Sequence, residues 1–347
     1  MARGSQRKQA IGRLERRLGK PERLADIVAE TDSRSIEVYP IFDPPEVAEA
    51  VASLVRDREM MPSRKIIAVD SVAKFYFEHP QETWTFRDYP NVAPPFDAMF
   101  VEYTGLDRIF SRGEWVKSPW MAERFGAFVT SWKPASLPDG YRVPWPEILL
   151  PEATWHTLTH PVAVRGGQLM SMGCAYAYSV AADGQMMDEP RVFGPPSFAE
   201  RLEEYDIHQL QSLIRCHMPP ILLSLCFMNC RNVSLEAHEP DLERNRLRRN
   251  AGVPPFVRYH TINIEPMKAV LRAEGDAAQV GVKKAMHSVR AHFVHYSEDK
   301  PLFGKHVGTF WKPSHVRGSI EAGIVDSDYR VSPPSPSATD PQPETAS

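Results

Sequence analysis

Proline is the residue that most limits how this chain can fold. There are 32 prolines among 347 residues, nearly twice the usual share of about 5%. Because proline lacks a backbone N–H and its ring clashes with the preceding helical turn, long uninterrupted helices cannot dominate the fold. Apolar residues make up 42% of the chain, which is ample material for a core. We therefore expect a globular protein assembled from short elements.

The middle of the chain has the pattern of a sheet. Between residues 84 and 194, short runs rich in β-branched and aromatic residues alternate with Pro, Gly, Asn and Asp, which is typical of strands joined by turns. A helix is expected at 197–230, opened by a capping-box pattern and broken or kinked at Pro219 and Pro220. The sequence predicts an α+β fold in which a kinked helix covers a β-rich antiparallel or mixed sheet.

Local patterns also predict the elements on either side. They indicate a helix at 46–58, a strand or helix at 65–79, strands at 231–240 and 256–264, and a basic linker or short exposed helix at 241–255.

The net charge of −3 hides an uneven distribution. Residues 241–317 carry 14 Lys/Arg and 7 Asp/Glu, whereas the rest of the chain carries 27 and 37. Half of the twelve histidines also lie in this stretch, namely His260, His287, His292, His295, His306 and His315. Guanidinium groups bind phosphate oxygens bidentately, and imidazole carries protons near neutral pH. The stretch therefore has the composition of a phosphate-binding surface.

We expect four segments. They are a basic N-terminal helix (1–30), an acidic α+β body (31–240), a small basic α+β module rich in His and Arg (241–331), and a disordered Pro/Ser/Thr-rich tail (332–347). Neither a secretory signal nor an apolar run of about 20 residues is present, so we expect a cytoplasmic protein without a membrane partner.

No metal or cofactor is predicted. The four cysteines, Cys174, Cys216, Cys226 and Cys230, lie mostly in apolar stretches, which suits buried thiols in a reducing compartment. Their spacing lacks a C-x-x-C knuckle, and the phosphate-binding, dinucleotide-binding and serine-hydrolase motifs are missing from the sequence.

Two runs in the basic module are predicted to form a hairpin. Strands at 287–296 and 307–318 would bring four side chains into one patch if register and face coincide, namely Arg290, His292, His315 and Arg317. Such a patch has the groups for metal-independent cleavage of RNA. One imidazole would act as general base and the other as general acid, while the arginines stabilise charge on phosphorus. Three interpretations remain open: a solvent-facing surface without a binding role, a noncatalytic phosphate contact, and a nuclease-type site.

The favoured hypothesis is a nucleic-acid-binding protein that acts through this module, with an RNase-like activity as its enzymatic version. The residues expected to contact RNA or DNA are Arg244, Arg246, Arg248, Arg249, Lys283, Lys284, Lys305 and Lys312. The competing hypothesis is a noncatalytic interaction or regulatory protein in which the same module binds a protein partner.

The C-terminal third resembles an uncharacterised family of proteins from phages and bacterial mobile elements. The resemblance covers roughly 225–331 and rests on the runs NCRNV, RYHTINI, HSVRAHF and LFGKHVGTFWKPSHVRG. Arg231 stands where lysine is usual in the family, and Ala291 where glycine is usual. The resemblance implies a phage or mobile-element context, and it attaches no activity to the chain. It also implies that the family's pattern rests on His287, Arg290, His292, Gly304, Trp311, His315, Arg317 and Gly318.

Overall fold

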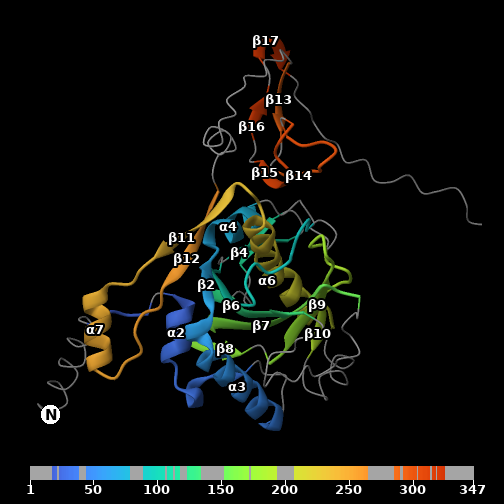
Figure 1. Ribbon diagram of the computed structural model, residues 1–347. Coiled ribbons are helices and arrows are strands. Elements are labelled where there is room, and N and C mark those ends of the chain that lie inside the picture. Colours follow the sequence, from blue (N-terminus) through green and yellow to red (C-terminus); the bar gives the residue numbers. More distant parts are fainter. Residues whose placement is uncertain are drawn as a thin grey trace, which may run out of the picture.

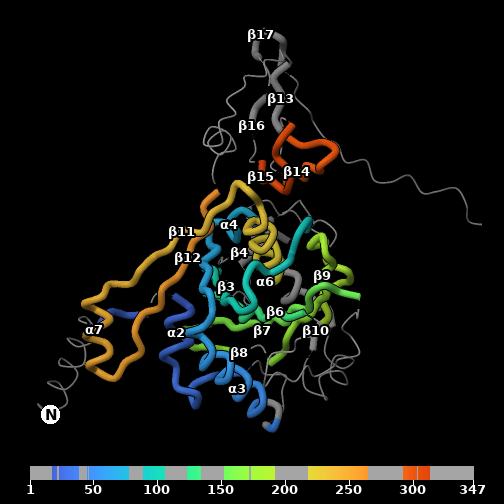
Figure 2. The backbone as a smooth tube through the Cα atoms, viewed as in Figure 1, coloured from blue at the N-terminus to red at the C-terminus, as the bar shows by residue number. Residues whose placement is uncertain are grey.

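The computed structural model of the protein describes most of the chain between residues 18 and 324 (Figure 1; Figure 2). The described residues are 18–21, 23–38, 44–78, 89–105, 108–111, 114–117, 123–133, 152–171, 173–193, 207–264, 285–289, 292–302, 304–312, 315–317 and 319–324. Most of the predicted N-terminal helix and the whole of the predicted tail lie outside these residues.

A ten-stranded mixed sheet forms the body. Its main path, in spatial order, is β1 (Glu37–Val38), β8 (Gln168–Ser171), β7 (Trp155–Arg165), β6 (Arg124–Trp132), β3 (Ala98–Thr104), β2 (Lys65–Ala68), β12 (Tyr259–Ile264) and β11 (Val233–His238). β9 (Ala175–Val180) pairs with β7, and β10 (Arg191–Phe193) pairs with β9. β2 is parallel to both β3 and β12, whereas β3, β6 and β7 are antiparallel. The predicted α+β class with a mixed sheet is confirmed.

Helices cover both faces of this sheet. They are α2 (Leu24–Glu30), α3 (Pro44–Glu59), α4 (Asp70–Glu78) and α6 (Ile207–Met228), with 3-10 turns at Ser33–Ser35 and Met61–Ser63. Successive residues of a strand point to opposite faces, so Met99 and Val101 of β3 share a core cluster with α4 and α6. Phe100 between them packs in a second cluster with Leu24 and Leu54 of α2 and α3.

The covering helix is less interrupted than the prolines predicted. α6 runs without a break through Pro219 and Pro220, and from Met218 to Phe227 all its side chains are buried. A proline inside a helix costs about 3 kcal/mol, whereas each large apolar side chain that becomes buried contributes about 1.5–3 kcal/mol. Burial of the apolar run therefore offsets the backbone hydrogen bonds that the prolines remove.

A long arm leaves one edge of the sheet. β11 and β12 pair antiparallel over six residues, and α7 (Leu242–Asn250) lies between them at the outer end (Figure 1). Because β12 also pairs with β2, it is a strand of the main sheet. The boundary predicted near residue 240 therefore falls between two neighbouring strands of one sheet.

Three smaller sheets complete the described fold. β14 (His292–Tyr296) pairs with β15 (Gly308–Lys312), β13 (Ala285–Val289) lies between β16 (His315–Arg317) and β17 (Ser319–Ile324), and β4 (Arg108–Ser111) pairs with β5 (Glu114–Lys117). None of the helices within the described ranges is long and apolar enough to cross a bilayer.

Candidate nucleic-acid interface

The helix of the arm is built by local signals in the sequence. Asp241 caps it, because its carboxylate accepts a hydrogen bond from the backbone N–H of Arg244 at 3.0 Å. Gly252 ends it with φ +70°, a left-handed conformation that glycine adopts without steric cost. Of the two alternatives left open for 241–255, the short helix is therefore the one observed.

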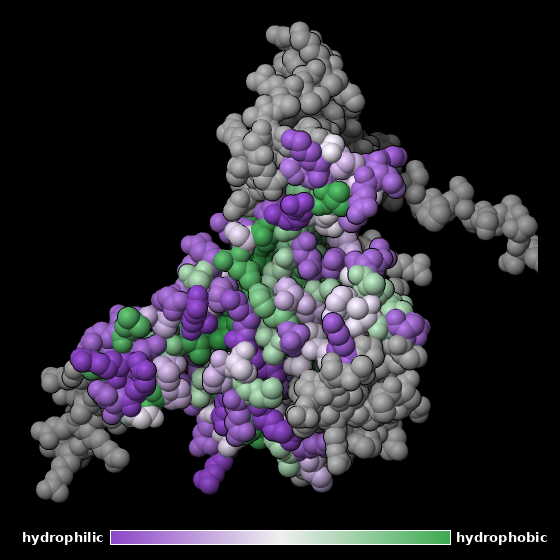
Figure 3. Space-filling view, in the orientation of Figure 1, coloured by the Kyte–Doolittle hydropathy of each residue, from purple (hydrophilic) through white to green (hydrophobic). Residues whose placement is uncertain are grey.

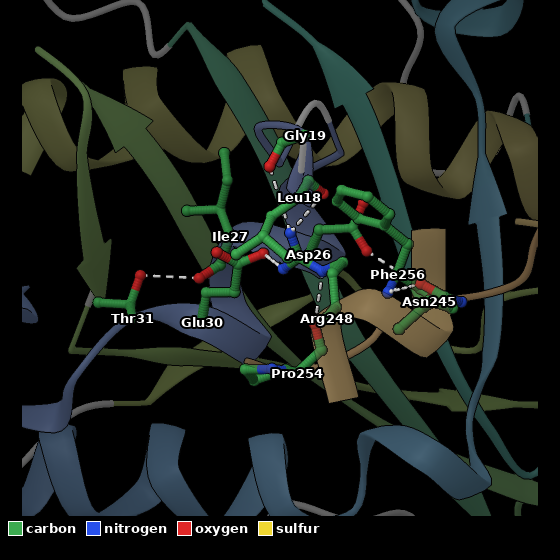
Figure 4. A network of polar contacts seen from close by, with 11 residues as sticks. Leu18, Gly19, Asp26, Ile27, Glu30, Thr31, Asn245, Arg248, Pro254 and Phe256 are labelled. Carbon is green, nitrogen blue, oxygen red and sulfur yellow. Dashed lines mark hydrogen bonds and ion pairs between the residues drawn. The ribbon is translucent and has the colours of Figure 1, made fainter. Parts of the chain in front are cut away.

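Arg248 holds α7 to the rest of the molecule (Figure 4). Its side chain is 1% exposed and forms an ion pair with Glu30 at the end of α2. It also donates hydrogen bonds to three backbone carbonyl oxygens, those of Leu18 (3.3 Å), Gly19 (3.3 Å) and Pro254 (2.8 Å). The guanidinium carbon lies 3.9 Å from the centre of the Phe256 ring, within cation–π range.

Asn245 makes a second clamp on the same inner side of α7. Its side-chain amide donates to the carbonyl oxygen of Phe256 at 2.9 Å, and the backbone N–H of Phe256 donates back to the amide oxygen at 2.7 Å. Asn245 and Arg248 are three residues apart and therefore share a helix face. Together they lock the helix onto the loop that follows it, so its orientation is set before any ligand binds.

Arg248 must be removed from the predicted nucleic-acid contacts. The sequence placed it in an exposed basic run, but its guanidinium is buried and its charge is opposed by Glu30. A buried arginine is stable only when it is paired and hydrogen-bonded, and these partners meet that requirement inside the fold. Its charge is therefore not available to a ligand.

Three cations of α7 are exposed, Arg246 and Arg249 on one side of the helix and Arg244 on the side near Gly19. Arg246 forms an ion pair with Glu243 at 2.7 Å, in which both side chains are about two-thirds exposed. Such surface pairs contribute roughly 0–1 kcal/mol, so Arg246 can exchange Glu243 for a phosphate at little cost. These three predicted contacts lie together on one rigid element.

The predicted hairpin is present in the described strands. β14 and β15 pair with His292 opposite Lys312, and β13 and β16 continue the same register with Val289 opposite His315. Arg290, Lys283 and Lys284 lie outside the described residues, and for Arg317 only the backbone pairing with His287 is described.

The register separates the two histidines of the proposed nuclease. His292 lies opposite Lys312, and His315 lies opposite Val289. Along the ladder, the two histidines are therefore three residues apart. Because residues alternate between faces, an uninterrupted ladder would place His292 and His315 on opposite faces. Convergence on one phosphate would require an irregularity at 290–291 or 313–314, which lie outside the described residues.

The described part of the hairpin carries fewer available cations than the arm. Lys305 is exposed. Lys312 is half-buried, and its ammonium donates a hydrogen bond to the hydroxyl of Tyr296 at 2.7 Å. The exposed Glu298 and Asp299 lie in the turn after β14 and oppose the positive charge there.

The hairpin is fastened to the body by contacts that the sequence did not reveal. Trp311 is 3% exposed and packs with its ring centroid 4.7 Å from that of Phe227 in α6 and 5.3 Å from that of Phe75 in α4. The buried side-chain amide of Asn232 donates to the backbone oxygen of Trp311 and accepts from its N–H, both at 2.9 Å. The NCRNV and FWKP runs that carry the family resemblance thus meet in space.

A buried carboxylate cluster was also missed. Glu102 on β3 is 2% exposed and accepts a hydrogen bond from the N–H of Ala25 at 2.7 Å. Arg23 lies 3.7 Å from Glu102 and donates to Asp70 at 3.1 Å. Burial raises the pKa of Glu102 to about 7. A lone acid within the apolar strand AMFVEYT is the signal that could have identified it.

Asp26 connects this cluster to the arm. Its carboxylate accepts a hydrogen bond from the N–H of Val257, which precedes β12, at 2.9 Å. Burial, with the nearby charge of Glu30, raises the pKa of Asp26 to about 6. α2 therefore contacts both the sheet and the arm through groups whose protonation changes near neutral pH.

Within the described part of the chain, no group of three or more His, Cys, Asp or Glu side chains could hold a metal ion. Cys174, Cys226 and Cys230 are buried free thiols, and burial raises the pKa of Cys174 to about 12.

Comparisons with known proteins add little. No family model matches the chain, and no curated protein matches it. Among solved structures, the crystal structure of AcrVA2 is similar at 13% identity with a TM-score of 0.22, over 73% of this chain and 70% of that one. A TM-score this low does not establish a shared fold, so the function must be argued from the chain's own residues.

Proposed function

We propose that the protein binds nucleic acid, and that α7 supplies the main contact. The main observation in support is that four neighbouring arginines differ in burial. Arg248 is buried and braces the helix, whereas Arg244, Arg246 and Arg249 are exposed on it. A ligand that meets the side of α7 with Arg246 and Arg249 therefore meets two guanidinium groups on a helix that is already ordered, and Arg244 extends the positive charge around it.

Phosphate is the ligand that this arrangement suits best. Arginine forks match phosphate oxygens bidentately, and each cation that neutralises a phosphate releases a counterion, which supplies most of the nonspecific affinity. Fixing the helix in advance lowers the entropy lost on binding. Lys305, exposed beside β15, is a secondary contact.

The RNase-like activity is not part of this proposal. It needs two histidines at one phosphate, and the ladder register pairs His292 and His315 with other residues. The activity stays a prediction from the sequence, and intact labelled RNA after incubation with the protein in chelator would contradict it.

The test is fluorescence anisotropy with labelled RNA and DNA over a range of salt concentrations. We expect log affinity to fall linearly with log salt. The triple variant Arg244→Ala, Arg246→Ala, Arg249→Ala should reduce the slope by up to about 3, because the slope changes by about 1 for each phosphate that is no longer neutralised.

A matched triple variant provides the control. Arg34, Arg56 and Arg191 are also exposed, and they lie on the body. Replacing these three with alanine should leave the slope nearly unchanged. Binding that is absent at low salt, or that the α7 variant and the control variant weaken equally, would refute the proposal.

A further inference from the structure

Phosphate binding leaves one feature of α7 unexplained. Leu242 is 78% exposed, the most exposed large apolar side chain among the described residues. Leu242, Arg246 and Arg249 lie at i, i+4 and i+7, and thus within about 60° of one another around the helix axis. An apolar side chain gains nothing beside a phosphate. The row therefore suits a surface that offers charge and an apolar group together.

The described surface argues against a single-stranded ligand. Proteins that bind single strands stack bases on exposed aromatic rings. No Phe, Tyr or Trp whose side chain the structure describes is exposed. Next to α7, the Phe256 ring is already covered by the guanidinium of Arg248. The arm thus has cations for a backbone and no platform for unpaired bases.

The shape of the arm distinguishes the two kinds of duplex. α7 is a single helix of nine residues at the outer end of a two-stranded arm (Figure 1), and in the same orientation the surface over this end is mostly hydrophilic (Figure 3). A helix with its side chains is roughly 10–12 Å across, and the major groove of B-form DNA, about 12 Å wide, admits it. The major groove of an RNA duplex is too deep and narrow for side chains to read.

We infer that the ligand of α7 is duplex DNA, with the row Leu242, Arg246 and Arg249 in the major groove and Leu242 against thymine methyl groups. This inference rests on the proposed function. Arg246 and Arg249 can reach guanine edges or phosphates there, and the 5-methyl of thymine is the apolar group that the major groove presents. Two acids, Asp241 and Glu243, lie at the start of the helix, where Asp241 accepts the capping hydrogen bond from the N–H of Arg244. Glu243 then gives up its exposed ion pair with Arg246.

The experiment compares four labelled probes of one mixed sequence by anisotropy at fixed salt. They are the DNA duplex, the same duplex with deoxyuridine in place of thymidine, the RNA duplex, and single-stranded RNA. We expect the DNA duplex to bind at least about tenfold more tightly than either RNA, because a groove contact adds to the contribution of the phosphates.

The deoxyuridine duplex isolates the role of Leu242. It lacks only the methyl group, and its loss should weaken binding by the wild-type protein about fourfold, the value of one buried carbon. Leu242→Ala should bind both DNA duplexes equally. Met60, the other exposed large apolar residue on the described surface, provides the control, because Met60→Ala should keep the fourfold difference.

The outcomes separate this inference from the proposed function. Equal or tighter binding to RNA would overturn duplex DNA as the ligand, yet it would leave arginine-dependent nucleic-acid binding in place. The groove contact would be overturned if the wild-type protein bound the thymidine and deoxyuridine duplexes equally. It would also be overturned if Leu242→Ala still bound the thymidine duplex more tightly than the deoxyuridine duplex. Absence of binding to all four probes would refute both.

Discussion

The arm and the β14–β15 hairpin both belong to the basic stretch, and they use their charges differently. On α7, one arginine is buried against Glu30 and three are exposed. On the hairpin, the attachment is made by Trp311 and Asn232, and Lys312 is engaged by Tyr296. The arm therefore uses one cation inside the fold to orient three outside, whereas the hairpin is held by aromatic packing and its described residues present fewer exposed cations.

This difference shows why a count of charges does not identify a binding surface. Arg248 and Arg249 are neighbours in the sequence, yet one is 1% exposed and the other is exposed. A helix turns by about 100° per residue, so neighbours face different surroundings. The pattern of burial, and not the density of arginine, decides which charges reach a ligand.

The largest effect on the free energy of unfolding is expected when Arg248, which anchors the arm, is replaced. Arg248→Ala leaves Glu30 and the carbonyls of Leu18, Gly19 and Pro254 without their buried donor. Removing one partner of a buried pair costs about 3–5 kcal/mol, and urea denaturation should show a loss of this size. Arg246→Ala, whose ion pair is exposed, should cost less than about 1 kcal/mol. Equal losses in the two variants would contradict the division between bracing and exposed arginines.

A smaller effect is expected when the hairpin anchor is broken. Asn232→Ala leaves the buried N–H and carbonyl of Trp311 unpaired, at a cost of about 3 kcal/mol in the free energy of unfolding. Hydrogen exchange should accelerate in β14 and β15 and stay unchanged in α7. A uniform acceleration in both regions would show that the hairpin and the arm are not anchored separately.

The smallest expected effect is a pH dependence of stability that comes from the buried carboxylates around α2. Glu102 and Asp26 have folded-state pKa values of about 7 and about 6, above those of an unfolded chain. Their contribution to stability is therefore fully present below about pH 4 and is lost as pH rises through these values. A tenfold difference in the proton affinity of a carboxylate between the folded and the unfolded chain changes the free energy of unfolding by at most about 1.4 kcal/mol. Relaxation of the protein around the carboxylate lowers this value. We expect a loss on the order of 2 kcal/mol between about pH 5 and pH 8.

Glu102→Gln should flatten this dependence, because the amide keeps an oxygen for the N–H of Ala25 and carries no charge to desolvate. Hydrogen exchange at about pH 8 should increase around α2 and α7 more than in the hairpin. A stability that rises between these two pH values in the wild-type protein would contradict the assignment.

Several elements were predictable because their signals are local. The helix expected at 46–58 appears as α3, and the ambiguous stretch 65–79 contains a strand followed by a helix from Asp70. The strands at 231–240 and 256–264 appear as β11 and β12. Caps, turns and periodicity act within a few residues of chain, so they can be read without knowing the fold.

The features that were not predicted are contacts between distant segments. The boundary predicted near residue 240 lies between β11 and β12, and nothing local shows that β12 pairs in parallel with β2. Arg248 was placed on the surface because its partners Glu30 and Leu18 lie more than 200 residues away. Pro219 and Pro220 were expected to break or kink the helix, and of these two outcomes the break does not occur, because the helix continues through both prolines.

The sequence by itself determined the α+β class and the concentration of positive charge after residue 240, and it indicated the two strands that pair as β14 and β15, since each follows from composition or short-range pattern. Only the tertiary structure decided which arginines are exposed, that Asn232 and Trp311 join the hairpin to the body, and that Glu102 is buried beside Arg23. The physical reason is that burial and hydrogen-bond partnership depend on which elements pack together. Those neighbours depend on the whole chain, so a local run such as AMFVEYT can indicate that Glu102 is buried but cannot show that Arg23 lies beside it.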